Sequence, residues 1–258
     1  MVQGLDKFKE YFGDYVGQYV FIGGTACDVL LDDIGASFRA TKDLDMVLLI
    51  EALNETFGIA FWKFIEDGGY QHKQKSTDKD QFYRFSKPIR TDFPAMIELF
   101  SRKSERMKLH FDSLLTPIHI SDNITSLSAI LLNDAYYELL IQGKTVVDGI
   151  SVLSIEYILL FKMKAWMDLF ERKKNDEYID SKDVTKHKND IFRLLIYISP
   201  SVEIEINNEV QEDLIKFIDM ILKEKVDLKS LGISNVSFNE LIDRIKSIYY
   251  YNTVEEIV

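Results

Sequence analysis

The sequence predicts an α+β protein, in which an amino-terminal half with a mixed β-sheet flanked by helices is followed by a carboxy-terminal helical region. Before Ser151, short apolar runs alternate with helical segments and with stretches of period two. After Ser154, apolar residues recur at helical spacing throughout. We therefore expect two domains, residues 1–150 and residues 151–258.

The first elements alternate between helix and strand. We expect a helix over Leu5–Tyr15, a short buried strand over Tyr19–Ile22, a strand over Leu44–Ile50 and a helix over Asn54–Asp67. Gly23 and Gly24 stop the first strand in a tight turn. Thr25 is expected to cap a helix that runs through Leu31 and is closed by Gly35.

The later elements follow from the same patterns. Strands are predicted at Tyr70–Lys75, Gln81–Phe85, Ala95–Phe100, Ile118–Ile120, Ser128–Leu132, Tyr136–Ile141 and Lys144–Val147. A hairpin turn is expected at Gln142-Gly143. Helices are predicted at Ile155–Arg172, Ser181–Ile198, Asn208–Glu224 and Phe238–Tyr250.

Composition limits the classes of function. No apolar stretch approaches ~20 residues, so we expect no membrane partner. Cys27 is the single cysteine, which excludes an internal disulfide and favours a cytoplasmic location. The net charge of −11 argues against non-specific binding of nucleic acid. Residues 71–110 nevertheless carry ten Lys/Arg against five Asp/Glu, which suits either an anionic ligand or a solvated face.

An acidic pair interrupts the strand that follows the Gly-Gly turn. Residues i and i+2 of a strand point to the same face, so Asp43 and Asp45 should lie side by side. Two like charges so close are unfavourable unless a cation lies between them or one is protonated. Carboxylate oxygens at that separation suit Mg²⁺ or Mn²⁺. The pair therefore predicts a metal site.

The turn before the helix supplies a complementary feature. Glycines let the backbone approach a ligand closely, and a helix N-terminus offers N–H groups and a positive dipole end. A phosphate held at Gly23, Gly24 and Thr25 beside a metal held by Asp43 and Asp45 describes a site for a nucleoside triphosphate. Glu98 interrupts a later apolar strand and is a candidate third carboxylate for metal-assisted phosphoryl displacement.

These motifs resemble a known family. Gly-Gly-Thr, a spacer, R-x-T-x-D-L-D and then a strand with Glu98 look like the DNA polymerase β-type nucleotidyltransferase superfamily, and within it the AbiEii-like group, which includes toxins of bacterial toxin–antitoxin pairs. The resemblance implies a nucleotidyltransferase-type sheet and transfer of a nucleotidyl group from a nucleoside triphosphate with Mg²⁺. It implies roles for Gly24, Thr25, Asp43, Asp45 and Glu98.

The group also has a helical motif with a lysine, followed by a basic-acidic pair. The segment "FKMKAWMDLFERKKNDEYIDSKDVTKHKNDIFRL" is similar to it. Lys162 lies on the apolar stripe of its helix, so we expect its ammonium to be paired with an anion, either the acidic cluster or the triphosphate. On the next helix a polar stripe could contact the nucleotide or the acceptor; it consists of Asp183, Lys186, His187 and Asp190.

Each candidate has a structural alternative. Asp43 can cap the start of its strand, and Asp45 can pair with Arg39 or Lys42. Glu98 can form an ion pair with Arg84 or Arg102. Lys162 can snorkel to solvent, and the polar stripe can be a solvated helix face. Arg39 and Thr41 either clamp phosphate or order the loop.

Two classes of function remain. The first is a metal-dependent nucleotidyltransferase that moves an NMP group onto an acceptor hydroxyl of RNA, protein or a small molecule, with an antitoxin protein as a further partner if the chain is a toxin. The second is a catalytically silent nucleotide-binding or partner-binding module on the same fold. A dinucleotide-binding fold is disfavoured because GGTACD does not match G-x-G-x-x-G.

Overall fold

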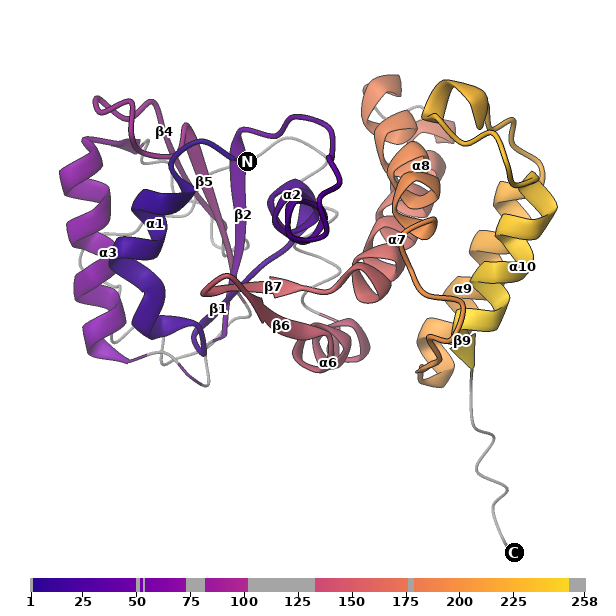
Figure 1. Ribbon diagram of the computed structural model, residues 1–258, viewed down its shortest axis with the longest axis horizontal. Helices are drawn as coiled ribbons and strands as arrows, with labels where there is room; N and C mark the ends of the chain where they lie inside the picture. The colour runs from indigo at the N-terminus through magenta and orange to yellow at the C-terminus, as the bar shows by residue number, and fades with distance from the viewer. Residues whose placement is uncertain are drawn as a thin grey trace, which may run out of the picture. The chain divides into compact units, whose positions relative to one another are not determined.

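The computed structural model describes residues 2–49, 52, 54–72, 82–101, 133–175 and 179–250. The chain forms two compact units (Figure 1). Unit 1 consists of Met1–Leu132 and Gln142–Ser154, and unit 2 of Asn133–Ile141 and Ile155–Val258. Most of helix α6 (Asp134–Gln142) therefore belongs to unit 2, although two strands of unit 1 follow it in the chain. The predicted domains, residues 1–150 and 151–258, place all of α6 in the first domain.

The described part of unit 1 is built on a seven-stranded mixed sheet with the order β3-β4-β5-β2-β1-β7-β6. The strands are β1 (Tyr19–Phe21), β2 (Asp43–Leu48), β3 (Gln71–His72), β4 (Phe82–Ser86), β5 (Met96–Ser101), β6 (Lys144–Val147) and β7 (Ile150–Leu153). Strands β2 and β5 are parallel, as are β1 and β7, and the other neighbours are antiparallel. The predicted α+β class with a mixed sheet is confirmed.

Helices cover both faces of this sheet. Helix α1 (Leu5–Phe12), which continues into the 3₁₀ turn η1 (Gly13–Tyr15), lies beside α3 (Glu55–Gly68) on one face, and α2 (Gly23–Asp33) lies on the other (Figure 1). The α1/α3 face is lined by aromatic rings. The ring of Phe61 on α3 lies 5.5 Å, centroid to centroid, from the ring of Phe85 on β4. Phe85 is the cross-strand neighbour of Ile97 on β5, so the side chain of Ile97 faces the α1/α3 side as well. Because side chains alternate along a strand, Glu98 then faces the α2 side.

The start of α2 differs from the expectation. The helix begins at Gly23 with Ile22 as N-cap, and no side chain caps it. The prediction that Thr25 is the cap is therefore wrong, because Thr25 lies inside the first turn and uses its hydroxyl elsewhere. The predicted closure is correct: Gly35 has φ +69° and its N–H donates to the carbonyl of Asp32 at 3.0 Å.

Two further predictions are wrong. Tyr136–Ile141 is not a strand but part of α6, whose buried residues recur at helical spacing and whose first turn is capped by the side chain of Asn133. The hairpin turn is not at Gln142-Gly143 but at Asp148-Gly149, between β6 and β7, where both residues have positive φ. The strands predicted at Ile118–Ile120 and Ser128–Leu132 lie outside the described residues.

Unit 2 is mainly helical, as predicted. Besides α6 it contains α7 (Ile155–Lys174), α8 (Ser181–Leu195), α9 (Asn208–Ile221), the 3₁₀ turn η2 (Lys229–Leu231) and α10 (Phe238–Ile248). A short parallel ladder joins β8 (Ile204–Glu205) to β9 (Tyr249–Tyr250), which periodicity did not predict. Trp166 of α7 is fully buried against Phe217 of α9, with ring centroids 5.5 Å apart. Within the described residues, no helix is long and apolar enough to cross a bilayer.

Candidate functional site

Three acidic side chains gather on two neighbouring strands of unit 1. In the parallel pair β2–β5, Asp45 lies directly opposite Glu98, and Asp43 lies opposite Met96. Asp43 and Asp45 are half-buried, whereas Glu98 is only 6% exposed. Because residues i and i+2 share a face, all three carboxylates point to the α2 side of the sheet. The sequence pattern anticipated the pair on β2 and the third acid on a neighbouring strand.

Glu98 also has a basic partner on the strand at its other side. Arg84 of β4 is its cross-strand neighbour, and both Nε and Nη2 of Arg84 donate to Oε1 of Glu98, at 2.8 and 2.6 Å. The sequence left two ion-pair partners open for Glu98, Arg84 and Arg102. The structure shows the pair with Arg84, and Arg102 lies outside the described residues. The pair gives a structural reason for a carboxylate in a buried strand, because an unpaired buried charge is strongly unfavourable.

The carboxyl of Glu98 nevertheless keeps a raised pKa. Burial is the largest cause, and the Arg84 guanidinium opposes it through charge and hydrogen bonding. The negative charge of Asp43 raises the pKa of Glu98 further, while a side-chain hydrogen bond with Asp45 lowers it. The net direction is upward, so the protonated form of Glu98 is favoured by its burial even with Arg84 in place.

The Gly-Gly turn is clamped against the acidic strand. Gly23 has φ +62°, a conformation that favours glycine, and a side chain there would collide with Oδ2 of Asp45. A Cβ on Gly24 would lie 2.7 Å from Oγ1 of Thr41. The N–H of Ile22 donates to the carbonyl of Asp45 at 2.9 Å. Both glycines are therefore needed for the close approach of this turn to β2 and to the loop before it.

Thr25 fixes the same turn from inside. Its side chain is fully buried, and its hydroxyl donates to the carbonyl oxygen of Asp43 at 2.6 Å. The hydroxyl is thus committed to the backbone of β2 and positions the start of α2 beside the acids. The first backbone N–H groups of an α-helix have no partner within the helix, so the amides at Gly23 and Gly24 are the donors of this turn that suit an anion.

The loop that leads into β2 carries Arg39 and Thr41. Arg39 is half-buried, and its guanidinium carbon lies 5.2 Å from the ring centroid of Phe38. Thr41 contacts Gly24, as described above, so it orders the loop at the turn. A loop-ordering role for Thr41 therefore has direct structural support.

In unit 2, Lys162 of α7 has a buried partner. Its Nζ donates to Oδ2 of Asp190 on α8 at 2.9 Å, and the two side chains are 6% and 0% exposed. The stem of Lys162 faces the interior, as its place on the apolar stripe predicts. The anion beside it is Asp190, so the expectation that the acidic cluster or a triphosphate would pair with Lys162 is wrong. Snorkelling to solvent is excluded by this burial.

The other members of the polar stripe on α8 are more accessible. Asp183 and His187 are half-buried and Lys186 is exposed. Asp190, which the sequence places on the same stripe, belongs to the core of unit 2. The stripe is therefore divided into a solvent-facing part and one buried acid.

Sequence reasoning missed one partner of a candidate residue and left another undecided. Asp190 was assigned to a polar face because its spacing matches Asp183 and His187, although the buried lysine on the preceding helix is a signal that some acid must accompany it. Arg84 was only one of two alternatives for Glu98. The alternation of β4 against β5 could have selected it, had the register of the two strands been known.

The donor set fits a hard divalent cation in part. Asp43 and Asp45 offer the carboxylate oxygens that Mg²⁺ prefers, and they lie side by side on one face of β2. Across the residues that the structure describes, however, no three acidic, histidine or cysteine side chains converge closely enough to hold one ion. Arg84 holds the third carboxylate, so Asp43 and Asp45 are the ligands that the structure supports best.

Comparisons with known proteins leave the family open. No family model matches the chain, and no curated protein matches it. Among solved structures, the chain is similar to an antigenic nucleotidyltransferase-like protein from Paracoccidioides brasiliensis, with 16% identity over 93% of this chain and 98% of the other, and a TM-score of 0.43. At this level of similarity, only the chain's own residues can indicate its chemistry.

Proposed function

We propose that the protein is a metal-dependent nucleotidyltransferase that moves an NMP group from a nucleoside triphosphate to an acceptor hydroxyl. One observation carries the proposal. Asp43, Asp45 and Glu98 face the same side of two adjacent parallel strands, and the Gly23-Gly24 turn at the start of α2 is clamped onto Asp45. Paired carboxylates beside backbone donors are the arrangement that binding a metal and a triphosphate requires.

The residues of unit 1 take the following roles in this proposal. Asp43 and Asp45 hold Mg²⁺ or Mn²⁺, which when bound neutralises charge on the phosphates and the leaving group. The amides of Gly23 and Gly24 bind a phosphate oxygen. Thr25 keeps the turn at the correct distance from β2. Glu98 accepts the proton of the acceptor hydroxyl, a task for which a pKa raised toward neutrality is suited.

The remaining candidates contact the nucleotide or acceptor in the same proposal. Arg39 reaches phosphate from the loop before β2. Asp183, Lys186 and His187 of unit 2 serve the nucleotide or the acceptor, in keeping with the helical motif of the AbiEii-like group. Lys162, whose ammonium is buried against Asp190, supports the helix that carries them. We further propose membership of that group, a cytoplasmic location and a toxin role with an antitoxin partner. The acceptor is RNA, a protein or a small molecule.

A catalytically silent module is the second candidate, and one observation favours it. The guanidinium of Arg84 already occupies Oε1 of Glu98, which a metal or an acceptor proton would need. The same ion pair between Arg84 and Glu98 would be present if these acids only stabilised the sheet. The two candidates differ in whether nucleotide is turned over.

The test is transfer of label from each of four α-labelled NTPs, with Mg²⁺ and either total cellular RNA or total protein. We expect Asp45→Asn to lower transfer by at least about 100-fold, because it removes a metal ligand and preserves shape. Asp32→Asn is the matched control, since Asp32 is an exposed acid at the end of α2. Transfer by the Asp45→Asn protein at the wild-type rate would rule out Asp45 as a ligand. Binding of nucleotide without transfer would favour the silent module.

A further inference from the structure

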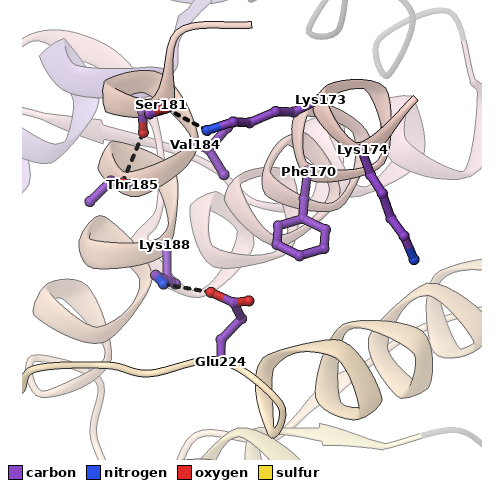
Figure 2. Close-up of a pocket in the computed structure, with 8 residues that line it drawn as sticks. All are labelled: Phe170, Lys173, Lys174, Ser181, Val184, Thr185, Lys188 and Glu224. Atoms are coloured by element: carbon purple, nitrogen blue, oxygen red, sulfur yellow. Dashed lines mark hydrogen bonds and ion pairs between the residues drawn. The ribbon is translucent and has the colours of Figure 1, made fainter. Parts of the chain in front are cut away.

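A pocket of about 370 Å³ lies within unit 2, apart from every residue assigned a role above. It is formed by the last turns of α7, the first two turns of α8 and Glu224, which follows the end of α9 (Figure 2). Its volume is in the range of pockets that hold small molecules. Basic residues outnumber acidic ones in its lining, whereas the chain as a whole is acidic.

Positive charge predominates in this lining. The lining contains three lysines and one carboxylate, in a protein of net charge −11. These residues are Lys173, Lys174, Lys188 and Glu224. The carboxylate is already neutralised by Lys188, whose Nζ lies 3.0 Å from it. Lys173 donates to the uncharged hydroxyl of Ser181, as Figure 2 shows. Lys174 has no acidic partner among the described residues. Among the described residues that line the pocket, an excess of two positive charges is left for an anion.

Helix dipoles account for only part of this charge. Lys173 and Lys174 lie in the last turn of α7, where cations are favoured by the macrodipole. Lys188 lies in the middle of α8, where the dipole provides no such reason. It shares one side of that helix with Ser181 and Thr185, which both line the pocket. The hydroxyl of Thr185 donates to the carbonyl of Ser181 at 2.8 Å, which leaves the hydroxyl of Ser181 as the donor for a ligand. A phosphate is the anion that two ammonium groups and this hydroxyl suit best.

One wall of the pocket is apolar. Phe170 and Val184 line it beside the lysines (Figure 2). The ring of Phe170 is only half-buried, and its other side contacts Trp166, with centroids 5.2 Å apart. A half-exposed aromatic ring beside phosphate-binding groups suits stacking of a planar ring. We propose that the pocket binds a phosphorylated ligand of mononucleotide size, with its phosphate at Lys173, Lys188 and the hydroxyl of Ser181, and its ring on Phe170.

The contact between Phe170 and Trp166 provides a direct readout. The sequence has two tryptophans, Trp62 and Trp166, so Trp62→Phe leaves Trp166 as the only one. We expect its fluorescence to change saturably when AMP is titrated into this variant. EDTA is present throughout, so that a metal-dependent site does not contribute. Ribose 5-phosphate and adenosine, titrated in parallel, separate the phosphate from the ring, and calorimetry measures the same affinities.

Charge variants then locate the site. Lys173→Gln and Lys188→Gln, each made in the Trp62→Phe protein, should weaken AMP binding at least tenfold, about 1.4 kcal/mol. Lys182→Gln is the matched control, because it removes the same charge from the exposed surface of α8 outside the lining. Phe170→Leu should remove the preference for AMP over ribose 5-phosphate. Thermal melts check that each variant folds; Lys173 is exposed, so its substitution does not disturb the core.

Three outcomes overturn the proposal: no saturable signal with AMP or ribose 5-phosphate at millimolar concentration, equal weakening by Lys182→Gln, or tighter binding of adenosine than of AMP. Adding Asp45→Asn to the Trp62→Phe protein keeps this test separate from the proposed transfer reaction. The pocket requires AMP binding to be unchanged by that substitution, whereas transfer requires Asp45. Loss of AMP binding in the Asp45→Asn protein would assign the nucleotide to unit 1 and overturn the pocket site.

Discussion

At the scale of single residues, the acidic cluster is held in balance by Arg84. Glu98 is buried, its pKa is raised mainly by that burial, and Arg84 provides the principal compensation. A raised pKa of an acid means that its ionised form is less stable in the folded chain than in the unfolded one. Folding therefore loses stability as pH rises from the unfolded pKa near 4.5 through the higher folded value.

Glu98→Gln removes this penalty and keeps the shape of the side chain. In EDTA, we expect the variant to have a higher thermal midpoint than the wild type at neutral pH, with the difference shrinking toward zero below about pH 4. Thermal melts across this pH range provide the measurement. A variant that is less stable than the wild type at pH 8 would show that the ion pair with Arg84 outweighs the burial penalty.

Gly23 is the residue that brings the turn onto Asp45. Gly23→Ala should cost about 1–2 kcal/mol because alanine is strained at positive φ, and it should also displace the Asp45 carboxylate. Gly35→Ala is the matched control: Gly35 has φ +69°, and nothing lies within 4 Å of its Cβ position. Both variants should lose similar stability in urea melts. Only Gly23→Ala should weaken Mn²⁺ binding measured by magnetic resonance; equal Mn²⁺ affinities would separate the turn from the metal site.

At the scale of elements, α7 and α8 are joined by the buried pair Lys162–Asp190. Removing one member of a buried pair leaves an uncompensated charge, so Lys162→Met should destabilise unit 2 by about 3–5 kcal/mol. Replacing both, with Lys162→Met and Asp190→Leu, should restore most of that loss. Urea melts of the single and double variants measure the coupling. If the double variant is as unstable as the sum of the single ones, the pair is not the cause.

Element prediction succeeded where one period dominates and failed where local capping decides. Helices α7 to α10 follow from apolar spacing alone, and β2 and β5 follow from apolar runs. The segment Tyr136–Ile141 has an apolar pattern compatible with either period, and the cap from Asn133 selects the helix. Thr25 has the composition of an N-cap, yet its hydroxyl bonds to Asp43, which is distant in sequence. Contacts of that kind are set by tertiary packing and are invisible to local propensity.

At the scale of the whole molecule, the sequence anticipated a mixed-sheet part, a helical part and the three acids on two strands. It did not anticipate that α6 joins the helical unit before the last hairpin of the sheet, since no local pattern encodes which unit a helix packs on. The site residues of unit 1 could be recognised because charges in apolar strands stand out. The partners Arg84 and Asp190 depend on register and on helix packing, which the sequence alone does not specify.

The two tryptophans can test whether residues of unit 2 contribute to nucleotide binding in addition to those of unit 1. Trp62 lies in unit 1 and Trp166 in unit 2, so Trp166→Phe and Trp62→Phe proteins each report the unfolding of one unit. A ligand that binds only the folded state stabilises it by about 2.7 kcal/mol at 100 times its Kd. We expect Mg²⁺ with one of the four NTPs to raise the midpoint seen by both tryptophans.

Asp45→Asn should remove the Mg²⁺-dependent part of each shift, whereas binding at the α7–α8 pocket persists in EDTA. A Mg²⁺-dependent shift seen by Trp62 alone would exclude Asp183, Lys186 and His187 from the transfer site. No shift with any nucleotide would refute a triphosphate site in this protein.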